Sequence, residues 1–535
     1  MESYKMNFYI ATLALATVLR LSLQASDNSS TSNWPQSAGP NYNYQASAQN
    51  PPVDWSVSRM ENILWQTDLP EGGQSTPAIW GNRLFVTITK PWPEDADPNL
   101  EPEGTGAVGY CLNSDTGKIL WSVSLSGTKV MKYAGIYSDS SSPSPITDGE
   151  NVWFFNASGS MGCWTFNGAV VWTREFEART RHHSRQHEPI LYGDTLFYVE
   201  VKNKVGANVG MHKDYPEGTD LSQYGTYIHA IDKLTGKVKW LADDSTAVHN
   251  TAMLGFLPNG KPAVLHGRGG GHAPLEKPYG LSLTSLSPND SGQTLWRHVI
   301  PKGSSHYTSM WNQRYVTWFD GPAHLVFDAT SGELLRTQSL QTDVTDYAFD
   351  SKAKSYVKHE HTELTTARKG TGTPVTDMAN LLVGDYHYFM SHDNFRLGRV
   401  NIETGRVEYV QVPLQVYREN GQPDRFIWEE KNVKNDTLNA RGIDVGAVDP
   451  RSKKSGWGHV SAATPIAIND KVYVSTMTGL TYVLQADAKD FSPDSILAIN
   501  DLGLGGHTWS LAQLATANNR IYAHTLKGII CIESD

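Results

Sequence analysis

The stretch Asn113-Ser-Asp-Thr116-Gly117-Lys-Ile-Leu-Trp121 contains the pattern that decides the fold. An Asn or Asp is followed by Thr-Gly or Ser-Gly, and a Trp stands four residues after the glycine. The polar residue and the glycine are typical of a tight turn with the glycine in the left-handed conformation. The pattern therefore predicts two strands joined by a turn, with the Trp packed between neighbouring sheets.

This pattern recurs along the chain. Residues 232–240 (DKLTGKVKW) form a second full copy, and shorter copies contain Gly168, Gly292, Gly332 and Gly405. A second repeated unit, an apolar strand, a turn and another strand, precedes it, as in residues 76–88 (TPAIWGNRLFVTI). Joining the two units gives an antiparallel module of four strands. The sequence predicts eight modules, at about residues 75–125, 141–177, 183–244, 249–301, 304–340, 365–413, 456–504 and 506–535.

The eighth module ends at Asp535, where the other modules turn into their fourth strand. A matching strand stands near the other end of the chain, because Ile63-Leu-Trp65 resembles Ile119-Leu-Trp121. An N-terminal strand that completes the C-terminal sheet would close a ring and leave no gap between the first and last blades. We therefore expect an all-β, eight-bladed β-propeller of four-stranded antiparallel blades over residues 60–535.

The composition and the N-terminal sequence indicate which partners and which compartment to expect. The 535 residues carry a formal net charge of -10, which argues against a generic nucleic-acid binder. Residues 1–25 predict a signal peptide, with Lys5 before a short apolar run and Ala25 at the cleavage site, and residues 26–59 form an extension. No apolar run reaches the length of a membrane span. We expect a protein exported to the periplasm or secreted.

The three cysteines, Cys111, Cys163 and Cys531, each stand at the start of an apolar triplet just before a turn. No CxxC or CxxCH spacing occurs, so redox, metal and haem roles are not indicated. We expect three buried thiols that act as small apolar side chains.

The turn, glycine and Trp pattern resembles the PQQ-like repeats of the quinoprotein alcohol dehydrogenase-like superfamily, over about residues 60–535. The resemblance implies one of several functions: a PQQ-dependent dehydrogenase, the propeller lipoprotein of the outer-membrane barrel-assembly machinery, or a secreted protein of another activity. PQQ dehydrogenases carry a disulfide between adjacent cysteines above the quinone, and no two cysteines are adjacent here. No Cys precedes Cys111 to carry a lipid anchor. PQQ is therefore not expected as a cofactor.

Long insertions predict the location of the functional site. They interrupt the second-to-third strand connections of blade 1 (residues 90–109), blade 3 (residues 202–226) and blade 4 (residues 266–280), and long segments also join blades 5 to 6 and 6 to 7. Loops longer than about 12–15 residues are uncommon unless they have a function. In a propeller these connections open on one face, so we expect a walled cleft over the central funnel.

Histidines point to the same place. Alignment of the modules puts His183, His249, His459 and His507 at the start of innermost strands. Neutral imidazoles beside arginines can move protons and bind an anionic group; alternatively, each His satisfies backbone groups at a crowded strand end. The predicted catalytic residues are His183, His187, His249, His306, Tyr307, His459 and His507. The predicted substrate-binding residues are Arg181, Arg185, Arg268, His272, Trp457 and Trp509.

This set of residues suits carbohydrate chemistry. Aromatic rings stack on sugars, Arg neutralises a uronate or sulfate, and His or Tyr can abstract the proton next to the carboxyl group in a β-elimination. A hydrolase would need paired carboxylates, and Glu188 has no clear partner in the sequence. We expect a monomer that binds an anionic polysaccharide or oligosaccharide. If the protein is an enzyme, we expect it to cleave this ligand as a lyase does. The alternatives are a non-catalytic docking scaffold and, third, a PQQ-dependent dehydrogenase; a divalent metal bound by the histidines stays open.

Overall fold

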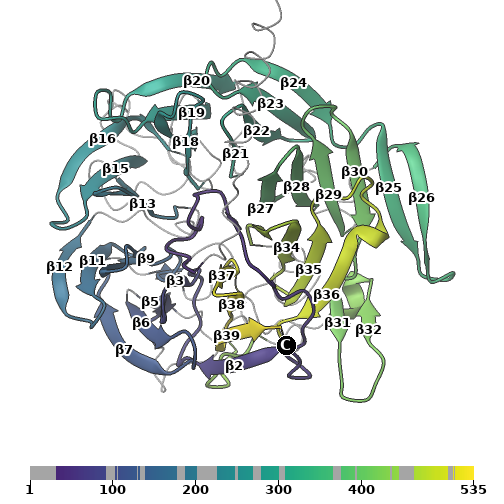
Figure 1. The fold of residues 1–535 in the computed structure, drawn as a ribbon, viewed down its shortest axis with the longest axis horizontal. Coiled ribbons are helices and arrows are strands. Elements are labelled where there is room, and N and C mark those ends of the chain that lie inside the picture. The colour runs from purple at the N-terminus through teal and green to yellow at the C-terminus, as the bar shows by residue number, and fades with distance from the viewer. Residues whose placement is uncertain are drawn as a thin grey trace, which may run out of the picture.

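The computed structural model describes residues 32–91, 103–104, 106–128, 131–132, 139–176, 187–201, 226–246, 251–268, 279–300, 308–364, 375–391, 395–433, 437–444, 463–503, 510 and 512–534. Strands dominate these residues, and two short 3-10 helices occur at Glu430–Asn432 and Pro493–Ser495. Eight antiparallel sheets stand around a common axis as the blades of a propeller (Figure 1). The predicted architecture is confirmed.

The first four blades follow the sequence repeats in order. Blade 1 contains β3 (Ala78–Trp80), β4 (Arg83–Thr89), β6 (Ala107–Asn113) and β7 (Ile119–Leu125). Blade 2 contains β9 (Ile146–Thr147), β10 (Asn151–Asn156), β11 (Ser160–Thr165) and β12 (Val170–Glu175). Blade 3 contains β13 (Ile190–Tyr192), β14 (Thr195–Val201), β15 (Thr226–Asp232) and β16 (Val238–Ser245). Blade 4 contains β17 (Met253–Phe256), β18 (Pro262–Arg268), β19 (Tyr279–Ser285) and β20 (Thr294–Ile300).

The remaining blades complete the circle. Blade 5 contains β21 (Met310–Trp311), β22 (Tyr315–Asp320), β23 (Ala323–Asp328) and β24 (Leu334–Ser339). Blade 6 contains β27 (Val375–Val383), β28 (Tyr386–Ser391), β29 (Arg396–Asn401) and β30 (Val407–Gln411). Blade 7 contains β33 (Ile466–Ile468), β34 (Lys471–Ser475), β35 (Leu480–Gln485) and β36 (Ile496–Asp501). Blade 8 contains β37 (Ala515–Ala517), β38 (Arg520–His524), β39 (Gly528–Glu533) and the N-terminal β2 (Ile63–Asp68).

Blade 8 closes the ring as the sequence predicts. Strand β2 runs antiparallel to β39, with Trp65 opposite Cys531 and Asp68 opposite Gly528. The last sheet therefore has its fourth strand from the other end of the chain, and β39 has no free edge. This pairing confirms closure by an N-terminal strand.

The repeated turn explains why the sequence motif recurs. The side chain of Asn113 accepts hydrogen bonds from the backbone N–H groups of Asp115 and Thr116, and Gly117 has a φ of 71°. A β-carbon on Gly117 would lie 2.6 Å from the ring of Trp65 in the preceding blade. The motif therefore specifies both the turn and the surface on which the neighbouring Trp packs.

Tryptophans fasten successive blades to one another through this turn. Each indole Nε1 donates to a backbone oxygen in the next blade: Trp65 to Ser114 at 3.1 Å, Trp121 to Phe166 at 2.9 Å, Trp172 to Lys233 at 2.9 Å and Trp296 to Ala329 at 3.0 Å. Blade 5 has Arg336 at the equivalent position, and its guanidinium donates to the carbonyls of Ile402 and Glu403. The predicted packing of the Trp between sheets is confirmed.

The N-terminal segment, residues 32–62, covers one end of the ring. The sequence predicted residues 26–59 only as an extension. In Figure 1 this purple segment crosses the middle of the propeller. Its fully buried Trp34 and Tyr44 pack in the hydrophobic core. It bonds to six blades, through Trp34 with Ile79, Pro35 with Thr147, Gln36 with Leu191, Tyr44 with Ala467, Gln45 with Leu382 and Gln49 with Asn519.

Smaller elements decorate this ring. β1 (Gln45–Ala46) pairs with β33, and β5 (Glu103–Gly104) pairs with β8 (Met131–Lys132). Blade 6 carries an additional hairpin, β25 (Val344–Asp350) and β26 (Ser355–Thr362), on its outer edge. A further hairpin, β31 (Gln415–Tyr417) and β32 (Arg425–Ile427), lies in the connection from blade 6 to blade 7.

The three cysteines are buried and free, as predicted. Burial raises the pKa of each thiol to about 12, so the thiols stay protonated and unreactive at neutral pH.

Candidate functional site

The two faces of the propeller differ. The N-terminal segment bonds to the first strands and to the turns that follow them, and so covers one face. The opposite face, which we call the insertion face, carries the ends of the fourth strands and the connections between second and third strands. The described ends of the insertions in blades 1, 3 and 4 lie there: β4 ends at Thr89 and β6 begins at Ala107, β14 ends at Val201 and β15 begins at Thr226, and β18 ends at Arg268 and β19 begins at Tyr279. We therefore expect a ligand to approach the axis from the insertion face.

Two of the predicted site residues, His187 and Arg268, lie among the described residues. The others lie outside them, and their roles stay predictions: Arg181, His183, Arg185, His249, His272, His306, Tyr307, Trp457, His459, His507 and Trp509. His187 is 4% exposed and lies three residues before β13, the innermost strand of blade 3.

Next to His187, Glu188 belongs to a chain of hydrogen bonds that joins the innermost strands. Its carboxylate accepts a bond of 2.9 Å from the backbone N–H of Ser144 in blade 2. The Ser144 hydroxyl accepts one of 2.9 Å from Thr76 in blade 1, whose own hydroxyl donates to Gln513 in blade 8 at 2.7 Å. These side chains bridge blades 8, 1, 2 and 3, so Glu188 has a structural role as well as a place beside the axis.

Arg268 is held in an ion cluster between blades 3 and 4. Its Nη1 lies 2.6 Å from Asp244, which also accepts bonds of 2.7 Å from the Nε and Nη2 of Arg297. Burial alone would raise the pKa of Asp244, but the bonds from Arg297 and Ser282 and the charge of Arg268 lower it overall. Arg268 is 4% exposed. Its guanidinium therefore already has a carboxylate partner, and its role in substrate binding stays a prediction.

A second set of histidines, which the sequence pattern did not single out, lies inside the blades. His229, His266, His324, His387 and His524 are all buried on second or third strands. Burial lowers the pKa of His266 and His524 to about 4 and that of His324 to about 3. These rings are neutral at physiological pH. Their positions between apolar residues of a strand were the sequence signal that could have found them.

Two of these rings form a polar relay between blades 5 and 6. The Nε2 of His387 lies 3.0 Å from the Oδ1 of Asn380, which can only accept, so this nitrogen carries the hydrogen. The Nδ1 of His387 then accepts from the Nε2 of His324 at 2.9 Å. The ring of Phe319 stacks on His387 at 4.7 Å. Such a closed, desolvated pair is suited to holding two blades together.

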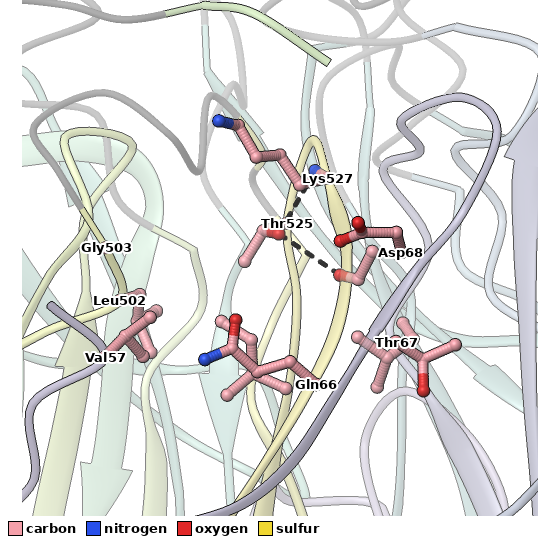
Figure 2. Close-up of a pocket in the computed structure, with 11 residues that line it drawn as sticks. Val57, Gln66, Thr67, Asp68, Leu502, Gly503, Thr525 and Lys527 are labelled. Atoms are coloured by element: carbon pink, nitrogen blue, oxygen red, sulfur yellow. Dashed lines mark hydrogen bonds between the residues drawn. The ribbon is translucent and has the colours of Figure 1, made fainter. Parts of the chain in front are cut away.

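Two of the hollows between described residues open on the insertion face. The blade 1–2 groove has a volume of about 360 Å³ and is lined by Ser124, Leu125, Ser126, Ser160, Met161, Trp164, Thr173, Arg174 and Glu175. The second, between blades 7 and 8, holds about 50 Å³ (Figure 2). Its rim includes Asp68, Thr525 and Lys527, and Figure 2 shows the Lys527 side chain extending away from Asp68. The larger groove is the better candidate for a ligand.

The blade 1–2 groove combines several kinds of polar group. Ser160 is 8% exposed, and its hydroxyl has no hydrogen-bond partner within the described part of the chain. Arg174 crosses to Glu200 of blade 3 through its Nη2. The groove thus offers hydroxyl groups, a guanidinium and a carboxylate beside the indole of Trp164.

The connection from blade 6 to blade 7 reaches across the insertion face. Arg441 forms an ion pair of 2.8 Å with the buried Glu71, which follows β2, and Asn439 donates to the same carboxylate at 2.7 Å. Across the described ranges, no group of three or more His, Cys, Asp or Glu side chains is arranged to hold a metal ion. No helix in these ranges is long and apolar enough to cross a membrane.

Comparison with known proteins identifies the repeat. The sequence model of the family described as outer membrane protein assembly factor BamB matches residues 57–255 and 104–309. A comparison with curated protein sequences finds no match.

Solved structures resemble the fold at low sequence identity. A europium-containing methanol dehydrogenase shares 12% identity at a TM-score of 0.52, over 92% of this chain and 89% of that one. A quinohemoprotein alcohol dehydrogenase from Comamonas testosteroni shares 11% at a TM-score of 0.49, over 95% and 81%. BamB from Moraxella catarrhalis shares 12% at 0.46, over 88% and 97%. At such identities, a likeness supports the fold alone.

The repeated turn, the eight closed blades and the family match agree with one another. Over residues 57–309 the sequence is similar to the BamB family, and the chain folds as a β-propeller like that of the europium-containing methanol dehydrogenase.

Proposed function

We propose that this protein is exported and binds an anionic polysaccharide or oligosaccharide on its insertion face. The observation that carries the proposal is the blade 1–2 groove, where Ser124, Ser126, Ser160 and Thr173 supply hydroxyl groups. Its volume lies at the lower end of the range of about 300–1,000 Å³ typical of small-molecule sites. Hydroxyl-rich ligands need many donors and acceptors. Arg174 also lines the groove, but it is paired with Glu200, so its attraction for a uronate or sulfate stays a prediction.

The asymmetry of the two faces supports this location. The N-terminal segment covers the opposite face, so a chain-like ligand would lie over the rim on which the insertions open. Cleavage of the ligand by His183, His249, His459 or His507 is a further prediction. His266, His324 and His524 do not take this role, because they are buried inside the blades, where a ligand does not reach them.

The test is titration calorimetry with a panel of uronate-containing, sulfated and neutral oligosaccharides. Ser124→Tyr would place a ring in the groove and should weaken binding at least tenfold. Ser122→Tyr is the matched control, because Ser122 lies two residues earlier on the same exposed side of β7 and does not line the groove. Equal binding by both variants would move the site elsewhere, and no binding to any anionic oligosaccharide would overturn the proposal.

A docking scaffold is the second candidate function. The family model that matches residues 57–309 is described as an outer membrane protein assembly factor. Under this alternative, no saccharide in the panel binds, and a protein of the cell envelope binds the insertion face instead. Blocking of that contact by Ser124→Tyr but not by Ser122→Tyr would support it.

A further inference from the structure

The hairpin on blade 6 extends that sheet to six strands. β25 pairs in parallel with β30, with Thr345 opposite Glu408 and Tyr347 opposite Val410. Arg396 holds the hairpin through two bonds to Asp346, of 2.6 and 2.8 Å. In Figure 1 the hairpin projects from the ring, and β26 is its outermost strand. The hairpin is therefore rigidly joined to the propeller while its outer strand faces away from it.

β26 is an open sheet edge. Among the described residues it pairs with β25 alone, and most of its residues are exposed, including Val357 at 42%. The outer side of such a strand presents unpaired N–H and C=O groups, which can bond to another strand. Edges are usually shortened, bulged or covered. β26 is eight residues long; it pairs regularly with β25 from Ser355 to His359, and a bulge follows before Thr362, with His361 at a φ of 51°.

The sequence of β26, SYVKHEHT, restricts which antiparallel strand can complete it. Alternate residues of a strand point their N–H and C=O groups toward the neighbouring strand. When two identical strands pair antiparallel, these groups therefore meet only if the numbers of the two facing residues are both odd or both even. A register centred on residue 358 would oppose Lys358 with a second Lys358. One centred on residue 360 would oppose two copies of Glu360. The register centred on His359 instead places each Lys358 opposite a Glu360.

We propose that β26 pairs with β26 of a second copy of this protein, antiparallel and centred on His359. The pairing would join two six-stranded sheets into one across a two-fold axis, so each copy supplies the same patch. Lys358 and Glu360, which lie 2.5 Å apart within one strand, would gain the opposite charge of the other copy. Pairing through one strand is a small contact, so the dimer belongs to the weak, concentration-dependent class.

The same charges explain why other strands are excluded. A foreign or shifted strand leaves Lys358 or Glu360 opposite an unmatched or like charge, which disfavours its pairing. The edge is thus protected against general aggregation while it remains complementary to itself. This inference replaces the monomer expected from the sequence with a monomer–dimer equilibrium.

Cysteine cross-linking tests the register directly. In the proposed dimer residue 359 faces itself, at a Cα separation of about 4.5–5.5 Å, within the range of about 4.4–6.8 Å that a disulfide requires. His359→Cys should therefore give a covalent dimer of the full-length protein under oxidised glutathione. Val357→Cys is the control, because the two copies of residue 357 would lie about 14 Å apart along the strand. The native thiols are buried and should not react.

Charge reversal provides an independent test by sedimentation velocity over a range of protein concentrations. Glu360→Lys should abolish the concentration-dependent dimer, and the double variant Lys358→Glu, Glu360→Lys should restore it. Lys431→Glu is the control, since Lys431 is 77% exposed and lies outside the hairpin. Equal cross-linking of the two cysteine variants, or a wild-type protein that stays monomeric at millimolar concentration, would overturn the proposal. Binding of an extended peptide along β26 in place of a second copy would overturn it as well.

Discussion

Acidification from pH 7 to pH 5 should destabilise the protein strongly, because the buried histidines resist protonation. In an unfolded chain a His has a pKa near 6.5, while burial lowers the pKa of His229, His266 and His524 to about 4. Between these two values unfolding takes up protons, so the free energy of unfolding falls as the pH falls. The stability is fully present above about pH 6.5 and is lost progressively down to about pH 4.

The magnitude follows from the same shifts. At pH 5 the unfolded chain gains about 2 kcal/mol for each such His relative to pH 7, since one unit of pKa is worth about 1.4 kcal/mol. Several histidines act together, and a typical domain has only about 5–15 kcal/mol in total. Glu200 acts in the opposite direction, because burial raises the pKa of its carboxyl group. We expect the loss from the histidines to dominate.

Urea unfolding at half-unit steps between pH 5 and pH 7 measures this dependence. The slope of the unfolding free energy against pH gives the number of protons taken up, which should reach three or more near pH 5. His266→Gln should reduce that number by about one. His361→Gln is the control, because His361 is exposed on β26 and its pKa is raised by Asp343. A stability that is constant between pH 5 and pH 7 would refute the reasoning.

Three other predictions concern packing, closure and the candidate site. Gly236→Ala should lower the free energy of unfolding in urea more than Gly193→Ala does. Both glycines have positive φ, but a β-carbon on Gly236 would lie 2.7 Å from the ring of Trp172, whereas one on Gly193 meets nothing within 4 Å. Equal losses would contradict the packing argument. Deletion of residues 26–70 should unfold or aggregate the protein, because β39 loses its partner strand and the core loses Trp34. A truncated protein that melts at the temperature of the full-length protein would contradict this prediction. Replacement of His183, His187, His249, His459 or His507 by Ala should reduce glycan binding or turnover, by about 10²–10⁴-fold for a general acid or base. The expected loss of stability is about 1 kcal/mol, and larger for the buried His187; lower melting temperatures with unchanged function would identify these residues as structural.

The sequence was sufficient to predict the ring because each blade repeats its own turn chemistry. Asn113, Gly117 and Trp121 each have a local or next-blade partner, so their spacing is visible in one chain. The similarity of residues 63–65 to residues 119–121 was enough to predict closure, because a single strand is stable only when it pairs with a sheet, and the eighth sheet has no fourth strand of its own. These are regular features, and regular features leave a periodic signal.

The contacts of the N-terminal segment and the blade 6 hairpin leave no such signal. Gln36 and Gln45 bond to residues that lie 155 and 337 positions away in the sequence, and neither belongs to a repeated motif. The partner of Arg268 could not be predicted either, because Asp244 lies in a different blade and is not marked by its neighbours. Burial of His324 against His387 depends on how two blades meet, which is a property of the assembled ring.

Closure by β2 has a consequence for how the protein is made. The end of the chain meets its beginning at Asn50 and Ser534, whose side chains bond across 484 residues of sequence. At about 5–20 residues per second, the ribosome would deliver the second of these ends on the order of half a minute to a minute and a half after the first. Until then β2 has no sheet to join, and the early blades form an incomplete arc with an open end. The final step of folding is thus a long-range loop closure, which should make late truncations and stalled chains far more prone to aggregation than the finished ring.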